Sequence, residues 1–245
     1  MMLNILKSEF LKTKHSGLVR DAVIIPMFAA IVSLVIGGPE IFTQFTIYWW
    51  ETLFLFLLVG ILFLNDQKSE QRAGDFQNIE ATDKTFNIYI AKIFLNILFI
   101  IIASFFFVVA DLCLKMVFPG IIKIDVRLLV ITCLGIVISM LWNIPLIYIV
   151  GRKVNSYVVI VLNIFLCFLI APFIANSSFW EMFPYTYHYH IAEKLYGIKP
   201  SGEQLSTFTH TNINSCVLPL FLSLLLFLFF IILLKKVTTH DQDNN

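Results

Sequence analysis

Between two long apolar runs, the sequence reads Asn65-Asp-Gln-Lys-Ser-Glu-Gln-Arg-Ala-Gly-Asp-Phe-Gln-Asn-Ile-Glu-Ala-Thr-Asp-Lys84, and no other stretch is so charged. Within it, Ala73, Phe76 and Ile79 recur at helical spacing, which predicts a short amphipathic helix in a coupling loop over 65–86. A helix of this kind offers a contact surface to a separate motor subunit. The alternative is a solvated loop with one buried apolar stripe.

The composition places this loop in a membrane protein. Hydrophobic residues make up 59% of the chain and charged residues 13%, with a mean hydropathy of +0.86. Soluble domains carry about 25% charged residues, so we expect an all-α integral membrane protein. The net charge of +1 leaves no basic surface for nucleic acid. The four cysteines show no CxxC spacing, so we expect them to be small apolar side chains.

Runs of about 20 apolar residues are long enough to cross a bilayer, and the sequence contains six. The predicted spans are 18–36, 46–64, 87–113, 126–150, 156–175 and 216–234. Prolines inside these runs predict kinks. Before the first span, Leu3, Leu6 and Phe10 lie on one side of a predicted helix over 2–16, which is typical of a helix in the membrane interface. All of 1–245 is expected to form a single transmembrane domain.

Positive charge predicts the orientation, because lysine and arginine favour the cytoplasmic side. An inner N-terminus puts most of the 17 lysines and arginines inside. Both termini are therefore expected in the cytoplasm, and 176–214 becomes the largest outer segment. This segment is aromatic and half apolar, which favours short interfacial or re-entrant helices. Its Trp180, Tyr185 and Tyr187 are the predicted substrate-facing residues.

Polar residues inside spans are costly and mark functional or structural contacts. We expect Glu51, Asn143 and Asn163 to line a translocation path. The alternative is that Glu51 reaches outer water and that the asparagines only join helices. Asp111 and Arg127 lie near the outer ends of their spans, where we expect them to pair with each other.

Catalytic motifs are missing from the sequence. It has no GxxxxGK[ST] loop for nucleotide, no HExxH and no GxSxG. His188, His190 and Glu193 form the one metal-like cluster, but a zinc site needs three or four converging ligands, so we expect no metal. Arg20 and Asp21 are expected to form a local charge pair.

Several motifs occur together: the N-terminal run Leu6-Lys-Ser-Glu-Phe-Leu-Lys12, six spans, and a first loop with Glu70-Gln-Arg-Ala-Gly74, Lys84 and Ala91-Lys92. In these features the chain resembles the ABC-2 class of transporter permeases. The outer runs Phe183-Pro-Tyr-Thr-Tyr187 and Gly197-Ile-Lys-Pro-Ser-Gly202 are similar to those of lantibiotic-immunity permease subunits. The resemblance extends over essentially the whole chain.

The resemblance implies an ABC-2 permease fold in a bacterial plasma membrane. It implies a cytoplasmic ATPase, carrying ATP and Mg²⁺, that docks on the loop helix. For this contact we expect Glu70, Arg72, Phe76 and Ile79. Phe76 is the expected anchor, because aromatic and arginine side chains dominate interfaces. A second permease subunit, identical or different, and the removal of an antimicrobial peptide from the membrane are also implied. The chain itself is expected to bind no cofactor and to be no enzyme.

Other functions remain open on the sequence. One is an exporter of another drug or peptide, which a sensitivity assay with different cargoes distinguishes. Another is an intramembrane metalloenzyme that uses His188, His190 and Glu193, for which metal analysis is decisive. The last is a sensory or accessory membrane protein without a transport cycle.

Overall fold

The computed structural model describes residues 2–13, 16–74, 84–205 and 213–243, and the side chains up to Thr239. These residues are almost entirely helical. The described part of the chain has one isolated antiparallel β-bridge, between Ile198 and Gln204. The predicted all-α fold is therefore confirmed.

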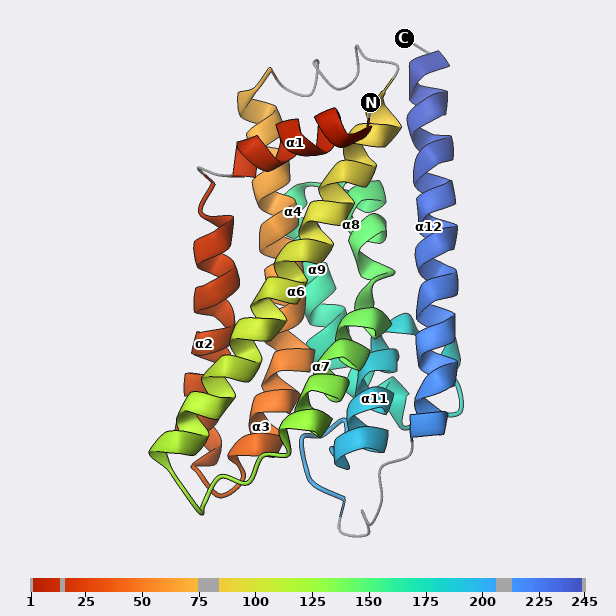
Figure 1. Ribbon diagram of the computed structural model, residues 1–245. Coiled ribbons are helices and arrows are strands. Elements are labelled where there is room, and N and C mark those ends of the chain that lie inside the picture. The colour runs from red at the N-terminus through yellow and green to blue at the C-terminus, as the bar shows by residue number, and fades with distance from the viewer. Residues whose placement is uncertain (1, 14–15, 75–83, 206–212, 244–245) are drawn as a thin grey trace.

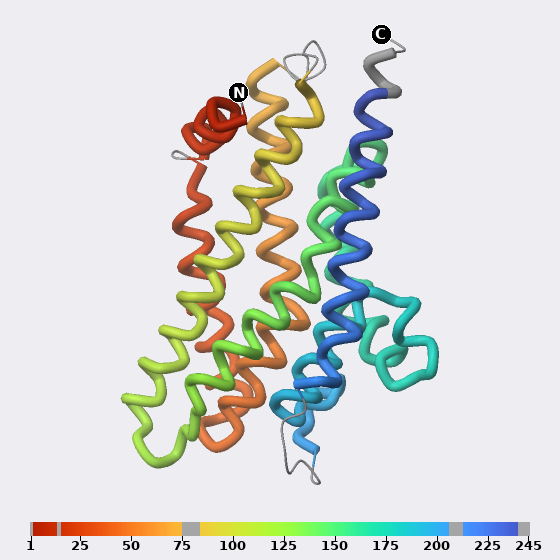
Figure 2. The backbone as a smooth tube through the Cα atoms, turned by 45° about the vertical axis from the view of Figure 1, so that its right-hand side comes forward, coloured from red at the N-terminus to blue at the C-terminus, as the bar shows by residue number. Residues whose placement is uncertain are grey.

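Six helical segments among the described residues are long and apolar enough to cross a membrane, as predicted. They span Leu18–Gly37, Phe42–Arg72, Thr85–Val117, Val126–Gly151, Ser156–Ala175 and Ile213–Thr239. Figure 1 and Figure 2 show them as an elongated bundle, with α2 (Leu18–Gly37) at one side and α12 (Val217–Asp243) at the other. Both termini lie at the same end, as an even number of crossings requires (Figure 1). This is the architecture of a multi-pass membrane protein.

The second crossing is longer than predicted at both ends. It consists of α3 (Phe42–Trp49), a π-helical turn η1 (Trp50–Phe54) and α4 (Leu55–Arg72). The predicted boundary at residue 64 is wrong by eight residues, because the polar run 65–72 continues the helix. Gln, Lys, Glu and Arg are good helix formers, and their polarity marks the edge of the apolar run rather than the end of the helix. The connection between the second and third crossings is therefore shorter than the predicted loop over 65–86. It begins near Ala73 and ends where α6 (Thr85–Val117) starts.

Two of the crossings change helix geometry close to a proline, Pro145 in the fourth and Pro172 in the fifth. The fourth splits into α7 (Val126–Met140) and α8 (Asn143–Gly151), with the break four residues before Pro145. Proline has no N–H to bond the carbonyl of residue i−4, and the Leu141 carbonyl instead accepts the N–H of Ile144 at 3.2 Å. The fifth crossing consists of α9 (Ser156–Phe165), a π-helical turn η2 (Leu166–Ile170) and α10 (Ala171–Ala175).

The segment predicted to lie on the outer side, which we call the outer segment, folds back onto the bundle in its described residues 176–205. It forms two 3₁₀ turns, η3 (Trp180–Met182) and η4 (Pro184–Thr186), followed by α11 (Tyr187–Tyr196). Helix α11 packs against α7 and α12, and η5 (Ile213–Cys216) leads into α12. Short helices were expected here, and residues 206–212 of the predicted 176–214 segment lie outside the described part.

The N-terminal helix α1 (Met2–Thr13) lies across the end of the bundle where the termini meet (Figure 1). It packs against α6, and Leu3 and Phe10 remain exposed. A helix crosswise to the spans with exposed apolar residues fits the interfacial helix expected from the sequence.

Candidate functional site

Two groups of predicted site residues meet in the interior of the bundle. Asn143 and Asn163, predicted for the translocation path, are buried and joined by a hydrogen bond from Asn143 Nδ2 to Asn163 Oδ1 at 2.7 Å. Tyr185, predicted for the outer segment, donates its hydroxyl to the same Oδ1 at 2.8 Å. The outer segment is therefore bonded directly to the fourth and fifth crossings. Asn143 Oδ1 and Asn163 Nδ2 have no hydrogen-bond partner in the described part of the chain.

A second buried row of polar groups adjoins this one, since the Phe56 ring packs against both Tyr185 and His188. Nδ1 of His188 lies 3.4 Å from Oε2 of Glu51, and its Nε2 lies 3.3 Å from Sγ of Cys167. Glu51 and Cys167 each sit in a π-helical turn, η1 and η2. Such turns widen a helix by one residue and occur frequently at functional sites. Here they aim a carboxyl and a thiol at the same imidazole.

The row Glu51–His188–Cys167 contains the groups that cysteine nucleophiles use, but all three side chains are buried, with exposed fractions of 0%, 1% and 0%. A substrate cannot reach the thiol in this conformation. The arrangement therefore acts here as an internal contact between the second crossing, the fifth crossing and α11. Sequence spacing gives no signal for it, because the three residues are far apart along the chain.

The metal-like cluster predicted from His188, His190 and Glu193 does not converge. His188 faces Glu51 and Cys167, whereas His190 Nδ1 lies 3.8 Å from Glu193 Oε2 and its ring packs on Trp180. Within the described ranges, no three His, Cys, Asp or Glu side chains are placed to share a metal ion. The geometry thus gives the metalloenzyme alternative no support.

Acidification should weaken the fold through His188. Burial, the largest cause, lowers the pKa of His188 to about 3, whereas an unfolded histidine titrates near pH 6.5. Between these values the unfolded chain takes up a proton that the folded chain does not, so the stabilisation is complete above about pH 6.5 and declines below it. We expect the wild type to lose about 2 kcal/mol more than His188→Gln between pH 6.5 and 5.

Detergent unfolding titrations at both pH values measure this difference. His190→Gln is the matched control, because His190 is only partly buried and its contribution should be smaller. If the wild type gains stability relative to His188→Gln as pH falls, the imidazolium forms an ion pair with Glu51 and the prediction is wrong.

The predicted substrate-facing residues are mostly enclosed. Tyr185 and Tyr187 are 7% and 2% exposed, and Tyr187 donates its hydroxyl to the Glu181 carbonyl at 2.7 Å. Burial raises the pKa of Tyr187 to about 12, so the hydroxyl stays protonated. Trp180 is partly exposed and packs against Tyr187 edge to face. Of the three residues, Trp180 has the most surface available to a ligand.

The predicted coupling residue Glu70 belongs to a ring of charges at the end of the bundle where the termini lie. Oε1 of Glu70 lies 2.6 Å from Lys92 Nζ and 2.9 Å from Lys12 Nζ. Glu9 completes the ring, at 2.8 Å from Lys12 and 3.2 Å from Lys92. Burial lowers the pKa of Lys12, but its pairing with Glu9 and Glu70 raises it more, so the net shift is upward. The ring joins α1, α4 and α6.

A further polar contact lies one turn deeper. The hydroxyl of Tyr148 donates to Asp66, and Asn96 Nδ2 donates to Tyr148 Oη at 2.8 Å and to Asp66 Oδ2 at 3.3 Å. Asp66 in α4, Asn96 in α6 and Tyr148 in α8 thus tie three crossings together. The sequence predicts a loop at Asp66, whereas α4 continues through it to Arg72, and this extension places the Asp66 carboxyl beside Asn96 and Tyr148.

Of the other residues predicted to contact the ATPase, the structure describes one. Arg72 is exposed at the end of α4, whereas Phe76 and Ile79 lie outside the described residues. Arg20 and Asp21 form the expected local pair at 3.1 Å.

The expected pair between Asp111 and Arg127 is wrong. Asp111 is fully buried and accepts the Thr46 hydroxyl at 3.0 Å, while Arg127 is exposed. Thr46 belongs to α3 and Asp111 to α6, so this hydrogen bond joins the second and third crossings. The Asp111 carboxyl group thus forms its hydrogen bond inside the bundle and does not pair across the loop.

These features define the chain as an α-helical multi-pass membrane protein with a buried polar interior and a charged ring at one end. No protein-family model, no curated protein and no solved structure matches it.

Proposed function

We propose that the chain is the membrane-spanning permease subunit of an ATP-driven exporter of the ABC-2 type. In this proposal the loop end of the bundle faces the cytoplasm of a bacterial cell. A separate ATPase binds and hydrolyses ATP, since the sequence has no P-loop. The cargo is an amphipathic antimicrobial peptide that is removed from the membrane, which gives the cell immunity.

The observation that carries the proposal is the charged ring of Glu9, Lys12, Glu70 and Lys92. The connection between α4 and α6 begins three residues after Glu70 and ends eight residues before Lys92. Buried ion pairs hold both ends of this connection against α1. A motor that moves the connection would therefore move α1, α4 and α6 together rather than bend a free loop.

The polar interior supports the same proposal. Asn143, Asn163 and Tyr185 connect the fourth and fifth crossings with the outer segment through two short hydrogen bonds. Hydrogen bonds between membrane helices contribute only about 0.6 kcal/mol each on average. Contacts of this strength can be exchanged for others when the helices shift, which a transport cycle requires.

Co-purification tests the proposal. The tagged chain is captured in mild detergent from its native membrane, and the proteins bound to it are identified by mass spectrometry. We expect a P-loop ATPase, together with a second six-span permease or a second copy of this chain. A preparation that preserves known membrane complexes and contains no ATPase would contradict the proposal.

A variant of Phe76 tests whether this residue contacts the ATPase. Phe76→Ala should reduce the amount of captured ATPase several-fold while the second permease is retained, because hot-spot aromatic residues contribute about 2 kcal/mol or more to an interface. Phe173→Ala serves as the control, since this exposed aromatic residue lies in the fifth crossing, away from the loop. Equal loss of ATPase in both variants would remove Phe76 from the interface.

A further inference from the structure

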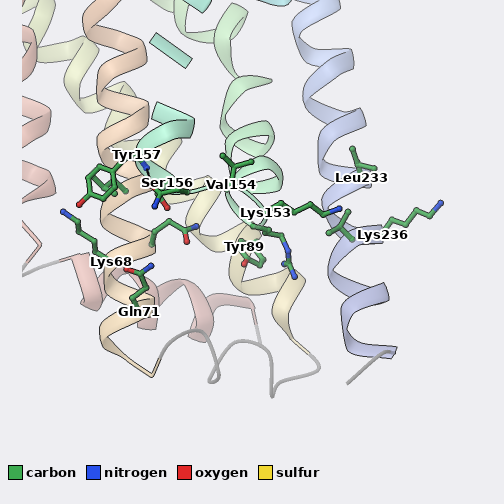
Figure 3. A pocket seen from close by; sticks show the side chains of 15 residues that line it. Lys68, Gln71, Tyr89, Lys153, Val154, Ser156, Tyr157, Leu233 and Lys236 are labelled. Carbon is green, nitrogen blue, oxygen red and sulfur yellow. Dashed lines mark hydrogen bonds between the residues drawn. The ribbon is translucent and has the colours of Figure 1, made fainter. Parts of the chain in front are cut away.

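A cavity of about 760 Å³ opens at the loop end of the bundle, between α4 and α12. Its walls come from the last turns of α4, from the α8–α9 connection at 151–156 and from the cytoplasmic-end turns of α12 (Figure 3). This volume lies within the range of about 300–1,000 Å³ that small-molecule sites occupy. Among the described residues, none of those predicted for transport or coupling lines it.

The cavity has a strongly one-sided charge. Its lining includes the cations Lys68, Arg152, Lys153 and Lys236, whereas no Asp or Glu of the described chain contributes to it. Figure 3 shows Lys68 and Lys236 on opposite walls, with Lys153 between them. Several cations around one space repel each other, and an anion between them removes that repulsion. The charge pattern therefore favours an anionic ligand.

Apolar residues lie one helical turn deeper on both walls. On α4, Leu64 precedes Lys68 by four residues, and on α12, Leu233 precedes Lys236 by three, so each pair shares one helix face. Both walls thus present an apolar side chain toward the membrane interior and an ammonium group toward the cytoplasmic end. A ligand that fits this order carries its negative charge at the surface and its apolar part in the bilayer.

Aromatic rings and a helix start complete the site. Lys68 Nζ lies 5.4 Å from the centre of the Tyr157 ring, and the Arg152 guanidinium lies 5.6 Å from that of Tyr89. These contacts hold two cations at the cavity wall. Helix α9 begins at Ser156, capped by the Asn155 side chain, so its positive dipole end lies at the same place and also favours an anion.

We propose that this cavity binds a phosphate-bearing anion. The two sources of that chemistry are the headgroup of an anionic phospholipid and a water-soluble phosphate. Basic pockets between transmembrane helices on the cytoplasmic side bind anionic headgroups, and the apolar residues below the cations provide room for the start of an acyl chain. The site does not depend on the cargo, because it would bind lipid or phosphate whichever cargo the chain carries, but it rests on the proposed orientation with the loop end in the cytoplasm.

Native mass spectrometry of the purified full chain tests the proposal. One arm offers dioleoyl phosphatidylglycerol against dioleoyl phosphatidylcholine, and the other offers inorganic phosphate without lipid. We expect preferential retention of phosphatidylglycerol. Lys153→Gln combined with Lys236→Gln should weaken it about 30-fold, since each cavity lysine that contacts the bound phosphate contributes about 1 kcal/mol net through its hydrogen bond.

A charge-matched control separates the site from general attraction to the basic face. Lys7→Gln combined with Lys235→Gln removes two exposed lysines from the same end, one of them next to Lys236, and neither lines the cavity. It should change retention less than threefold. Binding of inorganic phosphate that the first variant abolishes, without lipid retention, supports the site with a soluble ligand. Equal losses in both variants, undiminished binding in the first, or no binding of either probe would overturn the proposal.

Discussion

Lys92→Met should lower the free energy of unfolding by about 3 kcal/mol or more, because removal of one partner leaves an uncompensated buried charge. Lys92 is 3% exposed and lies between the carboxylates of Glu70 and Glu9. Without its ammonium group, Lys12 alone would remain to neutralise both of them. The nearly equal length of methionine keeps the packing, so the loss measures charge rather than a cavity.

Unfolding in detergent, followed by circular dichroism, measures the loss. Lys92→Met combined with Glu70→Met should recover most of it, since the variant leaves Glu9 and Lys12 as an intact pair at 2.8 Å. Asp21→Asn is the exposed counterpart and should change stability by less than about 1 kcal/mol, because its partner Arg20 is 70% exposed. A double variant as unstable as the single one would contradict the charge explanation.

Trp142→Ala should cost about 3 kcal/mol, near the lower end for large aromatic residues in a core. Trp142 lies at the break between α7 and α8, is 2% exposed and packs edge to face on Tyr185 with ring centres 4.8 Å apart. An unfolded membrane protein keeps its apolar residues in lipid, so the transfer contribution is small and lost packing makes up most of the cost. The cavity would also loosen the hydrogen bond from the Tyr185 hydroxyl to Asn163.

Thermal unfolding in detergent measures this effect, and Trp180→Ala is the control. Trp180 is partly exposed and belongs to the outer segment, so its removal should cost less than half as much. Trp142→Phe should restore part of the stability by refilling the space. If Trp180→Ala destabilised the chain as strongly as Trp142→Ala, the outer segment rather than the helix break would be the sensitive part of the fold.

Hydropathy predicted the number of crossings because a bilayer accepts only segments that satisfy their own backbone and present apolar side chains. All six apolar runs correspond to helices of spanning length. The ends of these helices were less predictable. The run 65–72 is polar, yet it remains helical because Glu70 and Asp66 find partners on α1, α6 and α8.

In the candidate site, too, the sequence identified some residues but not the contacts between them. Glu51, Asn143 and Asn163 were identified because polar residues in apolar runs are costly enough to require a reason. Of their partners, Tyr185 and His188 were singled out for substrate contact and for a metal-like cluster, and Cys167 was expected to be a small apolar side chain. The pairing depends on how α11 folds back between the crossings, and residue spacing along the chain carries no information about it.

The sequence by itself determined that this chain is a six-span helical membrane protein, because helix length and apolar composition are local quantities that the bilayer selects. Only the tertiary structure decided which charges pair, which polar groups face one another inside, and where cations gather around an open cavity. Those properties depend on distances between helices that are remote in sequence. Buried ion pairs and hydrogen bonds respond to differences of about 1 Å, which a pattern of residue types does not encode.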